Sequence, residues 1–428
     1  MKITKILKQL LVISSVFVGA ASAFAPTNFF VPYDPNLRLP AWKNQPFKLG
    51  ASVEYGASRK GHNWNGKRRN VLQLRDDTQS TIAMLQMSDT DAQWQLQRLD
   101  YSICDRALDD GVRGHLNFEG HYSQFETIVY GQYKFPLNNF PGELRLEAHL
   151  PIKHFNINKV SITDNTLATA DTGKHADDLV STFIADNILA TMSYRGIDLN
   201  NYSKTGVSDL VIMLYWEKAF KQDKDFLRNV NMYAKLGLTT PTGAKKDNAK
   251  AFSFAMGNDG AWGLPAGLGL SLDMKYHLRL GVDVEFLVLF DETHDRRMKT
   301  IRTQTEFLML NSGRATLDHG LTWKFNLFLQ EYQFVGGLSL KAAYEYIKHD
   351  DDRLHPKSNG FDYDIVNSAK SLSEWHSHNI IIQGNYDFFE ECNSCAIKPQ
   401  LGVFYKIPVG GKNIIDTQTV GGQLTLNF

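Results

Sequence analysis

After its first 23 residues the sequence has no hydrophobic run long enough to form a transmembrane helix. Such a helix needs about 18 or more consecutive apolar residues, and no later stretch provides them. An excess of positive charge is also missing, because 46 Lys and Arg residues balance 46 Asp and Glu residues. The first absence excludes a helical membrane protein, and the second argues against nucleic-acid binding. Neither excludes a membrane β-barrel, whose strands carry apolar side chains only at every second position.

Cysteine is scarce: the chain contains only Cys104, Cys392 and Cys395. Two residues separate Cys392 from Cys395 in an expected short turn, where an oxidising periplasm favours a local disulfide. A redox pair would need a βαβ context, which the flanking sequence lacks. Zinc would need two further ligands at suitable spacing, and none is nearby. We therefore predict no metal site and no cofactor, and we interpret Cys104 as a buried free thiol.

The N-terminus has the features of a secretory signal peptide. Three lysines precede an apolar run over residues 10–20, and Ala21-Ser22-Ala23 provides a small-residue cleavage site. The alternative is a retained anchor helix, for which the apolar run is too short. We therefore divide the chain into a signal peptide (1–23), a periplasmic N-terminal segment or partial plug (24–46) and a barrel (47–428).

The longest regular pattern covers residues 264–290, where every even position is apolar and the odd positions carry the charged residues. Alternation with a period of two is typical of a β-strand with one apolar and one polar face. The stretch is too long for one strand, so we expect a hairpin with its turn around residues 277–279. Opposed residues share a face, so a turn of odd length, about three residues, keeps the even residues together. Each arm is then long enough to cross a bilayer.

The same alternation recurs in thirteen segments, with a weaker fourteenth near residues 69–75. Residues 112–122 alternate on even positions and residues 125–135 on odd positions, so we expect two strands joined by an even-length turn. Long and short connections alternate, which favours long extracellular loops and short periplasmic turns. The sequence predicts an all-β fold, a transmembrane antiparallel β-barrel of about 14 strands, with twelve or sixteen as alternatives.

Two connections carry helical patterns. Residues 79–87 predict a short helix. Residues 177–189 place apolar side chains at helical spacing. The favoured interpretation is that this second segment caps the extracellular rim, and the alternative is that it folds into the barrel mouth as a constriction or lid.

Two motifs resemble known outer-membrane barrels. The last seven residues, Gly422-Gln-Leu-Thr-Leu-Asn-Phe428, resemble the C-terminal strand that the barrel insertion machinery recognises. Gly206-Val-Ser-Asp-Leu210, followed by Leu236-Gly-Leu-Thr-Thr-Pro-Thr-Gly243, is similar to the strand-loop-strand pattern of the phenol-degradation and long-chain fatty acid transporter group. Serine replaces the second glycine of that pattern at position 208, and the N-terminal plug motif of the fatty-acid transporters is not visible. The resemblance implies a hydrophobic substrate.

Inward-facing side chains decide what passes through a barrel. A wide, water-filled polar lumen is one interpretation of the charged positions, and a selectivity constriction is the other. Both signs are present, so no preference for anions or cations is predicted. The lumen-lining candidates are Arg113, Glu119, Glu143, Arg145, Glu147, Asp273, Lys275, Arg279, Asp283, Glu285, Lys341 and Glu345.

Three clusters have a simple interpretation and a functional alternative. His376 and His378 share a strand face, where an interfacial position is favoured over a metal pair. The basic residues 296, 297, 299 and 302 are either solvated or bind lipopolysaccharide phosphates. The acidic residues 350–352 are either solvated or attract a divalent cation.

The sequence predicts an outer-membrane channel or porin for passive diffusion of small solutes. The alternatives are a plugged transporter of hydrophobic compounds and a surface structural or adhesive barrel. No local signature marks a catalytic nucleophile, so we expect no enzyme. The expected partners are outer-membrane lipid and lipopolysaccharide, small solutes, and the insertion machinery through the strand ending at Phe428, with no nucleic acid.

Overall fold

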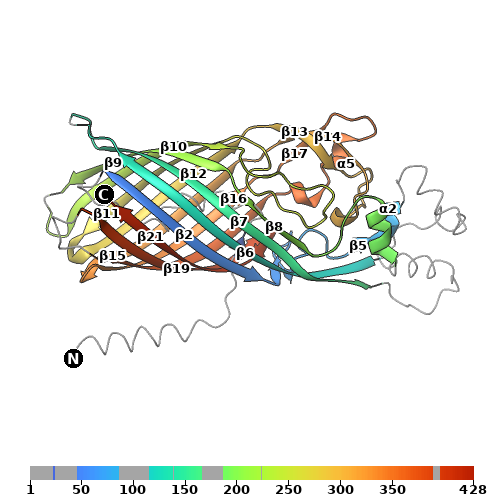
Figure 1. Ribbon diagram of the computed structural model, residues 1–428, viewed down its shortest axis with the longest axis horizontal. Coiled ribbons are helices and arrows are strands. Elements are labelled where there is room, and N and C mark those ends of the chain that lie inside the picture. Colours follow the sequence, from blue (N-terminus) through green and yellow to red (C-terminus); the bar gives the residue numbers. More distant parts are fainter. Residues whose placement is uncertain are drawn as a thin grey trace, which may run out of the picture.

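The structure, a computed structural model, describes residues 23–24, 46–85, 115–137, 139–165, 187–222, 224–388 and 396–428. Its main feature is a closed ring of 12 antiparallel strands (Figure 1). The ring closes because β6 pairs with both β2 and β7. The strands of the ring are β2 (Phe47–Ser58), β6 (His115–Lys134), β7 (Glu143–Asp164), β9 (Leu210–Lys221), β10 (Leu227–Thr240), β11 (Gly263–Met274), β12 (Leu278–Leu289), β15 (Thr322–Val335), β16 (Leu338–His349), β18 (Trp375–Asp387), β19 (Lys398–Lys412) and β21 (Gln418–Asn427).

Two further strands, β5 (Gln79–Ser80) and β8 (Tyr202–Val207), extend this sheet to 14 strands beyond the ring. The predicted antiparallel barrel of about 14 strands is therefore confirmed, with 12 strands closing it. None of the described helices has the length and apolar character needed to cross a membrane.

The two ends of the barrel differ. The C-terminus and the short connections lie at one end, which is periplasmic in barrels of this kind (Figure 1). The long connections lie at the other, extracellular end and form two small sheets. These connections contain β1 (Ala23–Phe24), β3 (Lys60–His62), β4 (Arg68–Asn70), β13 (Glu292–Arg297), β14 (Ser312–Asp318), β17 (Arg353–Pro356), β20 (Ile414–Asp416), α2 (Thr81–Leu85), α5 (Tyr363–Val366), η3 (Glu306–Leu308) and η4 (Lys370–Leu372).

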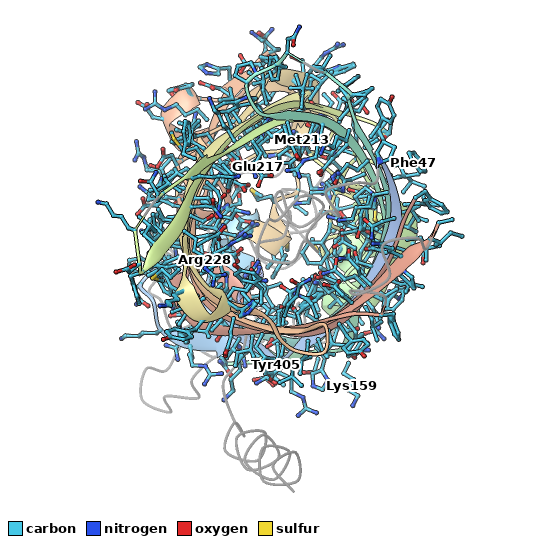
Figure 2. The ribbon with its side chains drawn as sticks, turned by 90° about the vertical axis from the view of Figure 1, so that its left-hand side faces the viewer. Phe47, Lys159, Met213, Glu217, Arg228 and Tyr405 are labelled. Carbon is cyan, nitrogen blue, oxygen red and sulfur yellow. The ribbon has the colours of Figure 1, made fainter. Side chains whose placement is uncertain are left out.

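The two faces of the ring have opposite chemistry. Along β15 the apolar Leu327 and Leu329 are exposed on the outside, whereas Lys324 and Asn326 of the same strand have no exposed surface. The neighbouring strands show the same alternation of buried polar and exposed apolar residues, so an apolar outer surface surrounds a polar interior. Figure 2, viewed along the barrel, shows Glu217 on the inner side of the ring. This division matches a barrel in lipid.

The hairpin of β11 and β12 follows the predicted register. Its arms have 12 residues each, and Leu272 lies opposite Leu280. The connection is a three-residue 3-10 turn, η2 (Lys275–His277), two residues earlier than predicted. Tyr276 and His277 have positive φ, which reverses the chain tightly.

The prediction of two strands over residues 112–135 is wrong, because β6 is one strand of 20 residues through residues 123 and 124. Its even residues face inward throughout. In the membrane half the exposed apolar residues are odd, such as Phe125 and Val129. Near the extracellular end the buried apolar residues are even, such as Leu116 and Phe118, because loops fill the interior there. The apolar residues of β6 thus change from odd to even positions at the point where the strand leaves the membrane.

Other local predictions had mixed outcomes. Of the helix expected at residues 79–87, Thr81–Leu85 form α2, residues 79–80 form strand β5 instead, and residues 86–87 lie outside the described residues. Residues 187–194 are helical, and the rest of the helix predicted over 177–189 lies outside the described residues. The weak strand near residues 69–75 is wrong as a barrel strand, since only β4 forms there and it pairs with β3. The cleavage site at residues 21–23, the segment 24–46 and the three cysteines fall almost wholly outside the described residues.

Candidate transport path

Inside the membrane half of the barrel, charged side chains form a belt across adjacent strands. Lys235 on β10 pairs with Glu285 on β12, and Lys324 on β15 lies 3.1 Å from the same carboxylate. The three side chains have essentially no exposed surface. Lys235 reaches across β11 because the residue between it and Glu285 is Gly267, where a Cβ would lie 2.7 Å from the lysine side chain. The glycine thus permits an ion pair between strands that are not neighbours.

A second belt lies beside the first and continues around the barrel. The Asn326 amide donates to Asp283 (3.0 Å), and the Asn379 amide donates to Glu345 (3.0 Å). Lys406 on β19 pairs with Glu345 at 2.6 Å. Buried charges are tolerated when they are paired and hydrogen-bonded. The lumen wall is therefore an ordered network with both charge signs.

The structure places most of the predicted lumen candidates on the inner face. Glu143 and Arg145 lie near the periplasmic rim and pair with Lys134 (2.7 Å) and Glu217 (2.6 Å). Asp273 pairs with Arg279 at the base of the β11–β12 hairpin. The candidates on the inner face are Glu143, Arg145, Glu147, Asp273, Arg279, Asp283, Glu285, Lys341 and Glu345.

Three candidates lie elsewhere. Glu119 is wrong as a lumen residue, because the inner face of β6 carries even positions and Glu119 is exposed on the opposite face. Lys275 is exposed in the turn η2, where strand alternation no longer applies. Arg113 lies outside the described residues.

The sequence interpretation missed several lumen cations. Lys235, Lys324 and Lys406 are buried on the inner face. Each lies between apolar positions of a strand that the alternation had already identified. The odd or even position of each lysine within its strand was therefore sufficient to predict that it faces the lumen.

Folded loops fill the extracellular half of the barrel. Phe252 and Phe307 from two loops contact each other and Phe118 of β6, with ring centroids 5.0 to 6.3 Å apart. Phe254 contacts Tyr122 and two further rings of the same cluster. Ile188 and Met192 of the helix over 187–194 are buried there too, so this helix packs inward. The mouth is therefore occupied by an apolar core instead of open water.

The motif around residues 206–210 fastens one of these loops to the rim. The Asp209 carboxylate accepts hydrogen bonds from the backbone amides of Gly243 (2.8 Å) and Asn258 (2.6 Å), the two ends of the loop. Thr242 donates to the Ser208 carbonyl and accepts from the Leu210 amide. A single carboxylate thus closes a loop of about fifteen residues over the barrel mouth.

A cavity of about 320 Å³ lies among these loops and the barrel wall. One part of its lining is apolar and includes Leu72, Phe252 and Ile197. Another part is charged and includes Lys246 and Arg296. Ligand sites commonly combine an apolar wall with a few polar groups, and their volumes start at about 300 Å³. This cavity is therefore a candidate binding space.

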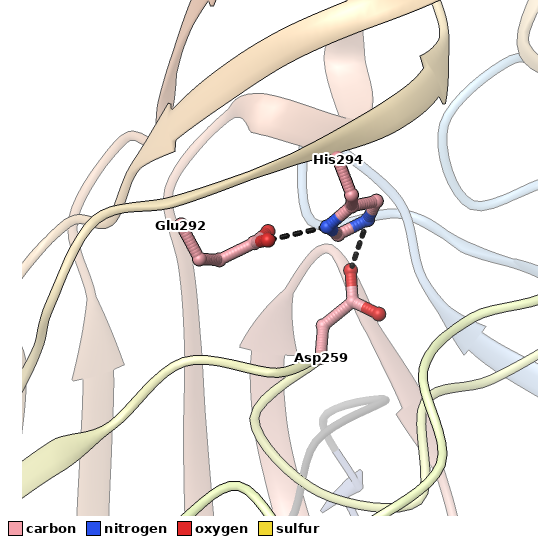
Figure 3. Close-up of side chains that lie close together, drawn as sticks. All are labelled: Asp259, Glu292 and His294. Carbon is pink, nitrogen blue, oxygen red and sulfur yellow. Dashed lines mark hydrogen bonds and ion pairs between the residues drawn. The ribbon is translucent and has the colours of Figure 1, made fainter.

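Asp259, Glu292 and His294 form a compact cluster beside the cavity (Figure 3). The two ring nitrogens of His294 face different carboxylates, Nδ1 towards Glu292 and Nε2 towards Asp259 at 3.5 Å. Arg296 pairs with both carboxylates, at 2.9 Å for Asp259. A metal would have to displace this cation, so the residues present fit an ion-pair node better than a metal site. The node ties β13 to the loop held by Asp209.

Three of the four basic loop residues predicted to be solvated or to bind lipopolysaccharide contact other parts of the protein. Arg296 lies in the ion-pair node, and burial lowers its pKa. Arg297 donates to the carbonyls of Leu310 and Asn248, and Lys299 donates to that of Arg302. These three cations hold the loops together, whereas Arg302 is exposed, as the solvated interpretation expects.

The other two clusters also have protein partners. His376 and His378 lie on the outer face of β18 beside Tyr346, as the favoured interfacial interpretation expects. Asp350 pairs with Lys348. Asp351 accepts from the Glu374 amide and is exposed, so the solvated interpretation holds for it. Asp352 accepts from the Gly320 amide and pairs with His349.

Comparison with known proteins relates the fold to solved structures. No family model matches the sequence, and no curated protein matches it. The crystal structure of the COG4313 outer membrane channel from Pseudomonas putida F1 is similar with a TM-score of 0.51 and 11% identity, covering 92% of this chain and 98% of that chain. This chain has the fold of an outer-membrane channel. The predicted resemblance to bacterial outer-membrane barrels is thereby confirmed at the level of fold.

Two more distant structures also align over most of their length. The transport unit of the autotransporter AIDA-I from Escherichia coli has a TM-score of 0.40 and 9% identity, over 94% of this chain and 96% of that chain. A Pseudomonas aeruginosa FadL homologue has a TM-score of 0.30 and 9% identity, over 95% and 98%. The TM-scores of these two structures are too low to support a conclusion about this chain. Its apolar outer surface and closed ring are those of an outer-membrane protein.

Proposed function

We propose that the protein is a passive outer-membrane channel for small solutes whose passage is restricted by loops folded into its extracellular mouth. The observation that supports this proposal is the order of two regions along the barrel axis. The membrane half has a polar, ion-paired lumen, and on its extracellular side the loops form an apolar core around a cavity. A solute would move between the cavity and the lumen, and the loops would set its size and chemistry.

The test is the single-channel conductance of the purified, folded protein in a planar bilayer. A restricted channel gives discrete steps, smaller than those of an open barrel of the same strand number. Absence of steps together with uptake of solutes by proteoliposomes favours the second candidate, a plugged transporter. The apolar wall of the cavity favours that candidate for hydrophobic compounds. Absence of both activities overturns the proposal.

The proposal includes no catalytic activity. Thr322, His349 and Asp352 are aligned like a nucleophile, base and acid, with contacts of 2.7 and 2.9 Å. Thr322 has no exposed surface, however, so a substrate cannot reach its hydroxyl. The alignment therefore supports a structural role in the barrel wall.

The proposed partners follow from the two ends of the barrel. We infer contact with lipopolysaccharide around the extracellular rim, and recognition of the C-terminal strand by the insertion machinery. The C-terminal strand β21 ends one residue before Phe428, whose exposed ring lies 6.0 Å from that of Phe47. Replacing Phe428 with Ala should slow assembly without changing the conductance of barrels that do assemble.

A further inference from the structure

We propose that the cavity among the extracellular loops is a binding site for a small organic anion with an apolar body, such as an aromatic carboxylate. This inference deepens the proposed channel function and rests on it. The supporting observations are a lysine without an ion-pair partner among the described residues and an apolar wall in the same cavity.

Lys246 provides the cation. Its backbone amide donates to Asp259, which anchors the residue, but among the described residues its Nζ has neither an ion-pair nor a hydrogen-bond partner. Burial lowers the pKa of Lys246, and nearby Arg75 and Arg296 lower it further, whereas Glu306 and Asp259 raise it. The residue is exposed and lines the cavity.

Several of the carboxylates that line the cavity are engaged in ion pairs, whereas the Asp247 carboxylate accepts from the Ala249 amide. Asp259 pairs with Arg296. Glu306 pairs with Arg75 at 2.8 Å and accepts from the Ser371 amide. A negatively charged ligand therefore meets Lys246 without displacing an existing ion pair.

The apolar wall and the volume define the rest of the ligand. Leu72, Ile197 and Phe252 are buried and line the cavity. At about 30 Å³ per water, 320 Å³ holds roughly ten waters. A molecule of benzoate size fits this space, with its carboxylate at Lys246 and its ring against the apolar wall.

The test is calorimetric titration of the full-length, folded protein in detergent with benzoate, benzamide and acetate. Benzamide has the shape of benzoate without the charge, and acetate has the charge without the ring. We expect benzoate to bind at least about tenfold more tightly than either, a difference of about 1.4 kcal/mol. Equal affinities for benzoate and benzamide, or no detectable binding of benzoate, overturn the inference.

Lys246→Gln is the decisive variant, and Lys245→Gln is its control. Lys245 precedes it in the same loop but does not line the cavity. We expect K246Q to lose the preference for benzoate over benzamide and K245Q to keep it. A K246Q protein that retains the preference contradicts the inference, and if K246Q does not fold, the wild-type comparison still decides. Conductance without benzoate binding overturns only the inference of a binding site. Benzoate binding without conductance overturns only the proposed channel function.

Discussion

The carboxylate of Asp209 accepts a 2.6 Å hydrogen bond from the backbone amide of Asn258, 49 residues further along the chain. The same carboxylate accepts from Gly243, so one side chain at the barrel rim holds both ends of a loop that covers the mouth. The space is tight, because a Cβ at Gly257 would lie 2.2 Å from the carboxylate. The rim and the loop therefore behave as one structural unit.

Replacing Asp209 with Ala should release this loop without unfolding the barrel. Hydrogen bonds to a charged group contribute about 1.5–3 kcal/mol each, and both are lost. We expect faster hydrogen exchange at the amides of Gly243 and Asn258 and faster tryptic cleavage after Lys245 and Lys246. Asp225→Ala, in a periplasmic turn, is the control, and equal exchange in both variants contradicts the role of Asp209.

Glu285→Gln should disturb the lumen because it removes the carboxylate that Lys235 and Lys324 both contact. Breaking a buried ion pair on one side typically costs about 3–5 kcal/mol. We expect a lower unfolding temperature and a reversal potential shifted towards anion selectivity. Glu119→Gln changes the same charge on the exposed face of β6 and should alter neither measurement. An E285Q channel with unchanged selectivity would show that the electric field of this buried belt does not act on the permeating ions.

Phe252→Ala should weaken the apolar core in the mouth. Phe252 is buried against Phe118 and Phe307, and truncation of a buried Phe typically costs about 3–5 kcal/mol. We expect larger and noisier conductance steps, since the loops no longer pack. Phe290→Ala removes an exposed ring at the rim and serves as the control. If both variants conduct like the wild type, the aromatic core does not restrict passage.

Acid should loosen the loops through His319. Burial lowers the pKa of His319 below 6.5. Nearby His349 and Arg296 also lower it, whereas Asp352 raises it. The unfolded loop then binds more protons than the folded one, so the stability present above pH 6.5 is lost as the pH falls below that value. We expect hydrogen exchange at Gly320, corrected for its intrinsic pH dependence, to accelerate between pH 7 and 5.

His319→Gln is the matched variant for this prediction. Gln cannot take up a proton in this range, so the acceleration should be smaller than in the wild type. The lowered pKa of Asp352 acts only below about 3.8 and does not contribute in this window. A variant with the same pH dependence as the wild type would assign the effect to another group.

Much of the barrel could be predicted from alternation alone, because lipid and lumen impose opposite chemistry on neighbouring residues. The hairpin of β11 and β12 shows this, since its arms, parity and turn length follow from the pattern of residues 264–290. The same rule misled at β6. Where loops replace water inside the barrel, Leu116 and Phe118 face inward, and the parity change resembles a turn.

The candidate site at the mouth was not predictable in the same way. Lys246 comes from the connection between β10 and β11, and Arg296 and His319 come from distant positions of the connection between β12 and β15, so they meet only through the folded loop assembly. No local pattern distinguishes Arg296, buried in an ion-pair node, from a solvated arginine. Lumen residues such as Lys324 could have been found from parity, whereas the cavity required the three-dimensional arrangement.

The central claim is that the loops folded into the mouth restrict passage through the barrel. A conductance measurement tests this claim most directly. The measurement compares the wild-type protein in a planar bilayer with a variant in which residues 244–256 are replaced by a short Gly-Ser linker. We predict small discrete steps for the wild type and several-fold larger steps for the variant, because the barrel wall is intact while the mouth is open. Identical conductance in the two proteins, or none in either, would contradict a loop-restricted channel.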